Sequence, residues 1–300
     1  MGDENADLLA QMMEAFRASD FPQEGLPEMQ AFLTGALADC AREPEKLAMI
    51  AIMPLTIGDL ASVRSLLERA KSAGSVDAAL GIAGGAAEYG HEALALEALD
   101  AAEAMGFADG ESERVRILLT TENVAAARPL LEKRAKDGDA RSAYILARIL
   151  EADEPDQAMA LLQRAYELGS GDAAFRIGLL THDDPSSEDF DTWIDRAIDL
   201  GCGDALLMRG LKLGEDDRQA GEPFLRRAVE EFEHGAAARE LGVWEREAGN
   251  TESALQLFHR AAEFGNTTAM YDLGVYHEHR MERDQAREWY EKGAEAGDDD

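Results

Sequence analysis

Aromatic residues make up only 6 % of the 300 residues, and runs of β-branched residues are scarce. Alanine and leucine dominate instead. Because unbranched side chains lose little rotamer freedom in a helix, this composition favours helices over sheets. A hydrophobic content of 46 % is ample for a packed core. We therefore expect an all-α protein.

Cysteines and long apolar runs are also few. Cys40 and Cys202 lie far apart and form neither a disulfide framework nor a CxxC pair, which fits a reducing compartment. The N-terminus, MGDENAD, has acids where a signal peptide needs bases, and the longest apolar run, Leu47 to Ile57, contains Pro54. We expect a soluble, cytoplasmic protein without membrane contact.

The chain has only 29 basic residues against 61 acidic ones, which gives a net charge of −32. Such a surface repels phosphate backbones, so direct nucleic-acid binding is excluded as the expected function. Two interpretations of the charge stay open. The acids keep an alanine-rich protein soluble, or they imitate DNA and occupy a DNA-binding protein.

Glycines recur at a fixed interval. The spacings are 32, 32, 31, 32, 64 and 32 residues, and the double interval indicates a missing anchor near residue 233; the anchors are Gly74, Gly106, Gly138, Gly169, Gly201, Gly265 and Gly297. Before each anchor, apolar or small residues at −11, −7 and −4 form the stripe of an amphipathic helix that ends at glycine. After it, a large residue at +8 and a small one at +9 indicate a second, closely packed helix. The pattern predicts helix A, a short turn, helix B and a glycine, repeated about seven times.

The last two copies, AAARELGVWEREAGNTESALQLFHRAAEFGN and TAMYDLGVYHEHRMERDQAREWYEKGAEAGD, resemble Sel1-like repeats of the tetratricopeptide class. The resemblance covers residues 138–297 well, 43–138 more weakly, and does not extend before that. It implies a right-handed α-solenoid of helix-turn-helix repeats with a period of about 32 residues, in which each hairpin packs on its neighbours. We expect a helical capping region at 1–43, the solenoid at 44–297 and an acidic tail at 298–300. Pro129 and Pro223 should make their helices start late or bend.

No catalytic motif is present, so we expect a non-enzyme without cofactors. The segment GIAGGAAEYG lacks the spacing of a dinucleotide-binding loop and is better explained as a close-packed helix A. DDPSSED, residues 183–189, lacks the spacing of a calcium loop and is better explained as a turn and helix cap. The arginine before the alanine of each helix B recurs in almost every copy and is expected to be architectural.

In the resembled family, helix A lines a concave groove. This implies a groove for a peptide or protein partner with apolar residues and carboxylates; its predicted residues are Arg116, Tyr144, Arg148, Phe175, Arg176, Leu207, Arg239 and Tyr271. The alternative is that the aromatic residues only pack successive A helices together and that the arginines pair with nearby acids.

Two C-terminal features invite a functional hypothesis. Met281, Trp289 and Tyr290 are candidates for an end contact that leads to self-association. The stretch YHEHR places His277 and His279 two residues apart, where helical side chains point in different directions, so no metal site is expected. We expect His277 to pack and His279 to lie at a turn.

The sequence thus predicts a non-enzymatic scaffold or adaptor that binds a protein segment in the groove of a Sel1-like solenoid. The alternative is an acidic inhibitor, similar to an antitoxin or immunity protein or to a DNA mimic, that binds a basic partner through its negative surface.

Overall fold

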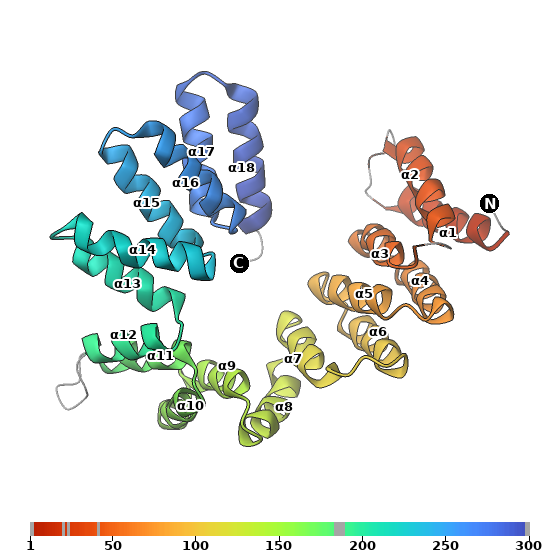
Figure 1. Cartoon of the computed structure of the whole chain (residues 1–300). Helices are drawn as coiled ribbons and strands as arrows, with labels where there is room; N and C mark the ends of the chain where they lie inside the picture. Colours follow the sequence, from red (N-terminus) through yellow and green to blue (C-terminus); the bar gives the residue numbers. More distant parts are fainter. Residues whose placement is uncertain (1–2, 20–21, 23–24, 41–42, 183–189, 298–300) are drawn as a thin grey trace. The chain divides into compact units, whose positions relative to one another are not determined.

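The computed structural model describes residues 3–19, 22, 25–40, 43–182 and 190–297 (Figure 1). Within these ranges the chain forms eighteen α-helices and no strand, so the all-α prediction is confirmed. None of the described helices combines the length and apolarity needed to cross a membrane. The chain divides into two compact units, Met1–Lys133 and Arg134–Asp300.

Unit 1 begins with two helices that pack on each other and on the pair that follows. Its helices are α1 (Asp3–Ala18), α2 (Leu26–Asp39), α3 (Lys46–Thr56), α4 (Leu60–Ala73), α5 (Val76–Glu88), α6 (Glu92–Ala104), α7 (Gly110–Thr120) and most of α8 (Val124–Lys136). That α1 and α2 form a capping region separate from the repeats stays a prediction.

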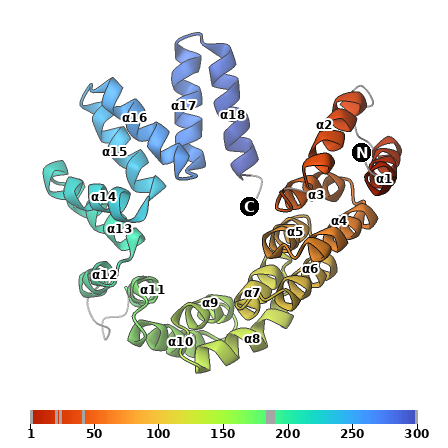
Figure 2. The same ribbon diagram turned by 45° about the vertical axis from the view of Figure 1, so that its right-hand side comes forward.

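Unit 2 is a series of helical hairpins in which each helix A packs on its own helix B and, from the second hairpin on, also on the helix B before it. Its helices are α9 (Ala140–Leu150), α10 (Pro155–Glu167), α11 (Gly171–Thr181), α12 (Phe190–Asp199), α13 (Gly203–Gly214), α14 (Arg218–Phe232), α15 (Gly235–Glu247), α16 (Thr251–Glu263), α17 (Thr267–His279) and α18 (Arg283–Gly297). In Figure 2, α9 and α11 lie on the inner side of this unit, and α10 and α12 lie on its outer side.

The glycine anchors end helix B as the spacing predicts. Six of the seven have positive φ, from +65° at Gly74 to +107° at Gly106. After four of the anchors, Gly74, Gly138, Gly169 and Gly265, the next residue caps helix A with its side chain. Ser170 Oγ accepts a hydrogen bond from the Ala173 N–H at 3.2 Å, and Asn266 Oδ1 accepts one from the Ala269 N–H at 2.8 Å. A stop and a cap in adjacent positions explain the short connection from B to A.

The missing anchor is Glu233. It lies where the spacing requires a glycine, and its φ is +50°, so the backbone makes the same left-handed turn without glycine. A second series of left-handed residues lies at the turns from A to B; it comprises Gly58, Gly90, Glu122, Gly249 and Met281. The sequence analysis did not identify this second series.

The two proline-containing helices, which we expected to start late or to bend, do not start late; a bend stays a prediction. Helix α8 begins at Val124 and α14 at Arg218, five residues before Pro129 and Pro223 respectively. Each proline lies beyond the first turn, so the backbone bond from that position to the residue four before is lost while the helix continues.

The glycine-rich segment is a closely packed helix A, as predicted. A Cβ on Gly81 of α5 would lie 2.4 Å from the Ala48 Cβ of α3, and one on Gly85 would lie 3.2 Å from a Leu55 methyl. The glycines therefore allow α3 and α5 to approach more closely than any side chain would permit. The predicted turn at 183–189 and the acidic tail at 298–300 fall outside the described residues.

Candidate protein-binding face

The candidate site is the exposed side of α9, α11, α13, α15 and α17, here called the A-helix face of unit 2. Seven of the eight predicted groove residues belong to these helices. Arg116 lies on α7 in unit 1 and is considered separately.

The structure brings four polar side chains together where α9 meets α11. Arg176 of α11 forms a two-pronged ion pair with Glu151, in which Nε lies 2.9 Å from Oε2. Arg148 Nη1 donates to Tyr144 Oη at 3.3 Å, and its Nε lies 3.7 Å from the same Glu151 carboxylate. Two arginines thus share one carboxylate, and the cluster keeps one net positive charge.

The shared carboxylate is held in its charged form. The hydrogen bond from Arg176 lowers the pKa of Glu151, and the same pair raises the pKa of Arg176. Arg148 is the more accessible arginine, since half of its side chain is exposed against 27 % for Arg176. Arg148 is therefore the cation that an incoming group can reach without breaking the main ion pair.

Arg239 is engaged in another way. Its Nε donates to Asp272 Oδ2 at 2.7 Å, and only 14 % of the Asp272 side chain is exposed. This pair ties α15 to α17. Phe175 and Leu207 are half-buried and pack against the core of unit 2, as does the ring of Tyr144. For these residues the geometry agrees with the alternative in which aromatic residues pack and arginines pair.

Arg116 pairs within its own helix. Its Nε lies 3.0 Å from Glu113 Oε2, and this contact raises the pKa of Arg116. In addition, a Cβ on Gly84 of α5 would lie 3.4 Å from the guanidinium, so Arg116 extends over α5.

The three end-contact candidates separate into two places. Met281, 81 % exposed, and Tyr290 line a concavity of about 650 Å³ together with Glu278 and Ala286. The Tyr290 ring also lies 5.6 Å from that of Tyr271, which is 60 % exposed.

Trp289 lies elsewhere. It packs against the core formed around Phe258, and its ring lies 5.3 Å from that of His259 on α16. It therefore faces the preceding repeat, and Met281 and Tyr290 do not share a surface site with it.

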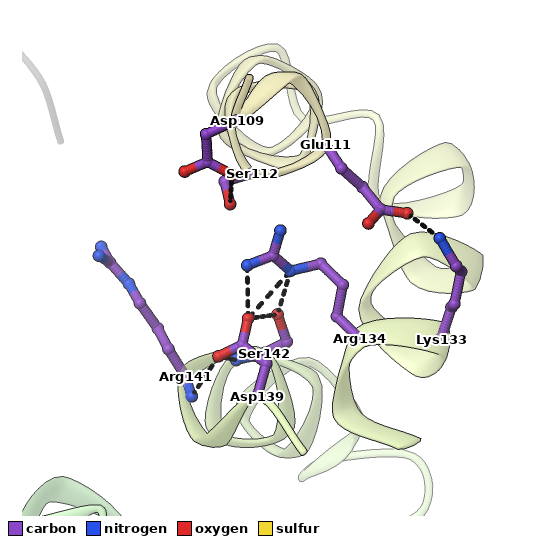
Figure 3. Close-up of polar contacts among 8 residues, drawn as sticks. All are labelled: Asp109, Glu111, Ser112, Lys133, Arg134, Asp139, Arg141 and Ser142. Atoms are coloured by element: carbon purple, nitrogen blue, oxygen red, sulfur yellow. Dashed lines mark hydrogen bonds and ion pairs between the residues drawn. The ribbon is translucent and has the colours of Figure 1, made fainter. Parts of the chain in front are cut away.

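The recurrent arginine is represented by Arg134 (Figure 3). Its guanidinium donates to Asp139 Oδ2 at 2.6 Å and to Ser142 Oγ at 3.1 Å, while Asp139 itself caps α9. Arg164, one repeat later, donates to the backbone carbonyl of Ala135 at 3.0 Å. Both arginines connect the end of a helix B to its neighbours, which is the architectural role expected. By contrast, the Arg141 side chain extends away from the cluster in Figure 3.

The YHEHR histidines lie as the repeat pattern predicts. His277 is mostly buried and its Nδ1 lies 2.8 Å from Glu282 Oε2, while His279 is the last residue of α17. His277 thus holds the turn between α17 and α18.

Sequence reasoning missed the two carboxylates that organise the face, Glu151 and Asp272. Asp272 follows Arg239 by 33 residues, so a search for acids one repeat away from each arginine would have found it. Glu151 follows the end of α9 directly and has no such signal in the spacing.

The chain has solved structural relatives, although no family model and no curated protein matches its sequence. A Sel1 repeat protein from Oxalobacter formigenes is 19 % identical with a TM-score of 0.51, over 70 % of this chain and 99 % of that one. A protective antigen of uropathogenic Escherichia coli with an SLR fold is 17 % identical at a TM-score of 0.47, over 97 % and 69 %. The immunity protein Pa5087 from Pseudomonas aeruginosa is 18 % identical at 0.46, over 57 % and 75 %.

These features define the class as helical-repeat proteins. More specifically, the chain has the Sel1-like, tetratricopeptide-like repeat fold, as the Oxalobacter formigenes structure shows.

Proposed function

We propose that the protein is a cytoplasmic, non-enzymatic scaffold that binds a segment of another protein along the A-helix face of unit 2. The repeat fold supports a role in protein interaction. The observation that carries the proposal is the cluster of Tyr144, Arg148, Glu151 and Arg176, a locally positive site in a chain of net charge −32.

The cluster indicates the chemistry of the ligand. A carboxylate on the partner can bind the exposed side of Arg148 and form a charge-assisted hydrogen bond, while the ring of Tyr144 provides apolar surface beside it. Arg176 stays paired with Glu151 and keeps the site in shape. Tyr271, more than half exposed, offers a second apolar contact at the other end of the face.

Binding of labelled peptides tests the proposal. The probe is a peptide in which apolar residues alternate with glutamate, and its affinity is measured by fluorescence anisotropy for the wild type and for Arg148→Ala. We expect Arg148→Ala to weaken binding about tenfold or more, since a charge-assisted bond contributes roughly 1.5–3 kcal/mol. Arg141→Ala is the matched control, because Arg141 is an exposed arginine on the same helix. Equal affinities of the two variants would contradict the proposal.

Self-association is a second candidate, favoured by the exposure of Met281 beside the concavity of α17 and α18. An apolar side chain at 81 % exposure next to a concave surface is suited to contact with a second copy. Mass measurement by light scattering over a range of concentrations tests this. We expect a dimer that Met281→Glu dissociates, and a strict monomer at all concentrations would exclude it.

The inhibitor alternative, in which the acidic surface binds a basic partner, predicts a different salt dependence. Binding to the A-helix face combines one charge with apolar contacts and should persist at moderate salt. An interaction carried by surface charge alone should weaken steeply over the same range.

A further inference from the structure

A row of exposed apolar side chains lies at the edge of unit 2 where each helix B ends. The residue before four successive left-handed anchors, those at 169, 201, 233 and 265, is a large apolar one; these four residues, here called the edge ladder, are Leu168, Leu200, Phe232 and Phe264. The first three are 42 %, 39 % and 36 % exposed, and Phe264 is half-buried. Single exposed apolar residues are ordinary, but a large apolar residue at the same place in four successive repeats, exposed in three of them, is a recurrent feature.

Contacts between two successive repeats place Phe232 next to the connection that follows Leu200. The Phe232 ring packs over the backbone of the preceding connection, since a Cβ on Gly201 would lie 3.6 Å from the ring and one on Gly203 3.2 Å from the Phe232 Cβ. His234 reinforces this alignment: its Nε2 lies 3.0 Å from Asp204 Oδ1, and its Nδ1 accepts from the Ala237 N–H. The ring of Phe232 therefore lies over the connection that begins directly after Leu200.

Each member of the ladder is preceded by an acid, namely Glu167, Asp199, Glu231 and Glu263. Glu167 and Asp199 are exposed and make no hydrogen bond or ion pair with the described part of the chain. Asp172 and Asp204, in the first turns of α11 and α13, add carboxylates to the same edge.

One of the four acids is paired within its own helix, since Arg227 Nε donates to Glu231 at 2.9 Å. The other arginines of this edge make different contacts. Arg164 donates to the backbone carbonyls of Ala135 and Lys136. Arg196 stacks on Trp193, with its guanidinium carbon 4.6 Å from the ring centre, and Arg260 lies 5.5 Å from the ring centre of Phe264. At Leu168 and Leu200 the edge thus presents an apolar side chain next to an acid, Glu167 or Asp199, that has no ion pair in the described part of the chain. Asp204, by contrast, is paired with His234.

We propose that the edge ladder is a second binding surface, which takes a basic, extended segment of another protein with apolar side chains at regular intervals. Successive members of the ladder are one repeat apart. In an extended polyproline II segment, which has three residues per turn and rises about 3.1 Å per residue, every third side chain lies on the same side, so apolar residues at every third position can face the ladder together. Lysine or arginine at the intervening positions lies against the row of acids. The surface differs from the A-helix face in position and in the charge of its ligand.

The probe is a labelled peptide of about 15 residues with leucine at every third position and lysine or arginine elsewhere. Binding to the full chain is followed by fluorescence anisotropy. We expect this peptide to bind, and we expect the same peptide with serine in place of leucine, or with glutamate in place of the basic residues, to bind at least about tenfold more weakly. Equal binding of the serine peptide would overturn the proposal, because charge alone would then suffice.

Substitutions locate the contact. Leu200→Ser should weaken binding about fivefold to tenfold. The matched control is Leu180→Ser, since Leu180 is 41 % exposed and Leu200 39 %, and only Leu200 belongs to the ladder. Both side chains are exposed, and circular dichroism verifies that each variant is folded. Equal effects of the two substitutions would overturn the proposal.

The acids are tested in the same way. The pair Glu167→Gln with Asp199→Asn should weaken binding of the basic peptide more than the pair Asp153→Asn with Asp216→Asn, which removes the same charge from the opposite, A-to-B edge. Equal weakening would show that the overall charge of the protein attracts the peptide, and it would overturn the proposal that the edge ladder binds it. Because Arg148→Ala leaves the ladder intact, loss of binding at the A-helix face does not affect this result.

Discussion

Replacement of Glu233 by glycine should stabilise unit 2. Glu233 has a φ of +50°, whereas the equivalent residue in six other repeats is a glycine with positive φ. The left-handed conformation costs an L-residue about 1–2 kcal/mol. Glycine removes that cost but is more flexible in the unfolded chain, which offsets about 0.5–1 kcal/mol. The net gain should be about 0.5–1 kcal/mol.

Urea denaturation followed by circular dichroism measures this gain, and Glu233→Gln is the control because it removes the charge but keeps a side chain at the left-handed position. We expect the midpoint of Glu233→Gly to exceed that of Glu233→Gln. The reverse substitution at an anchor, Gly265→Ala, should lower the free energy of unfolding by about 1 kcal/mol. The φ of Gly265 is +78° and no atom lies within 4 Å of an added Cβ, so only backbone strain would cause this loss. A Glu233→Gly variant no more stable than Glu233→Gln would refute the reasoning.

Three further predictions follow from named contacts. Gly81→Ala should destabilise unit 1 by roughly 1–3 kcal/mol, because its Cβ would overlap Ala48. Gly84→Ala should be neutral or stabilising by up to about 1 kcal/mol, because its Cβ would meet only the end of a flexible arginine. Thermal melts of the two variants measure the difference. The pKa of Glu151 is lowered in the folded protein, so its ion pair stabilises the protein above the unfolded pKa, and this contribution is lost as the pH falls through the folded pKa. Glu151→Gln should therefore reduce the loss of unfolding free energy at acidic pH. An unchanged dependence of stability on acidic pH would contradict this. Burial raises the pKa of Cys202 to about 12, so iodoacetamide should not label it at pH 8 in the folded chain but should label it in urea, as mass spectrometry would show.

The repeat could be predicted from the sequence because its signals are local. Glycine at a fixed interval and the apolar stripe before it both act within one hairpin, and even the missing anchor at 233 could be located by spacing. What the spacing could not show is that Glu233 itself adopts the left-handed turn. It also left open whether α8 and α14 begin after Pro129 and Pro223 or continue through them, because packing on both sides of a helix can offset a lost backbone bond.

The candidate site could be predicted only in part. Position within the repeat indicated which residues belong to the A helices, since that follows from periodicity. The partners of Arg176 and Arg239 lie 25 and 33 residues away, and whether two such side chains meet depends on how successive hairpins are rotated, which one hairpin's sequence does not encode. The same limit explains Trp289, which takes its place from contact with His259 of the preceding hairpin.

Contacts in unit 2 join each hairpin almost only to the one before and the one after. The surfaces that meet at α12 and α13 are built from the same kinds of residue as those at α14 and α15. Excision of one whole period, α13 with α14, would therefore bring together two surfaces that already suit each other. The length of this array is thus a property that gene duplication or deletion can change in steps of one repeat, and each added step would also lengthen the row of apolar residues along its edge.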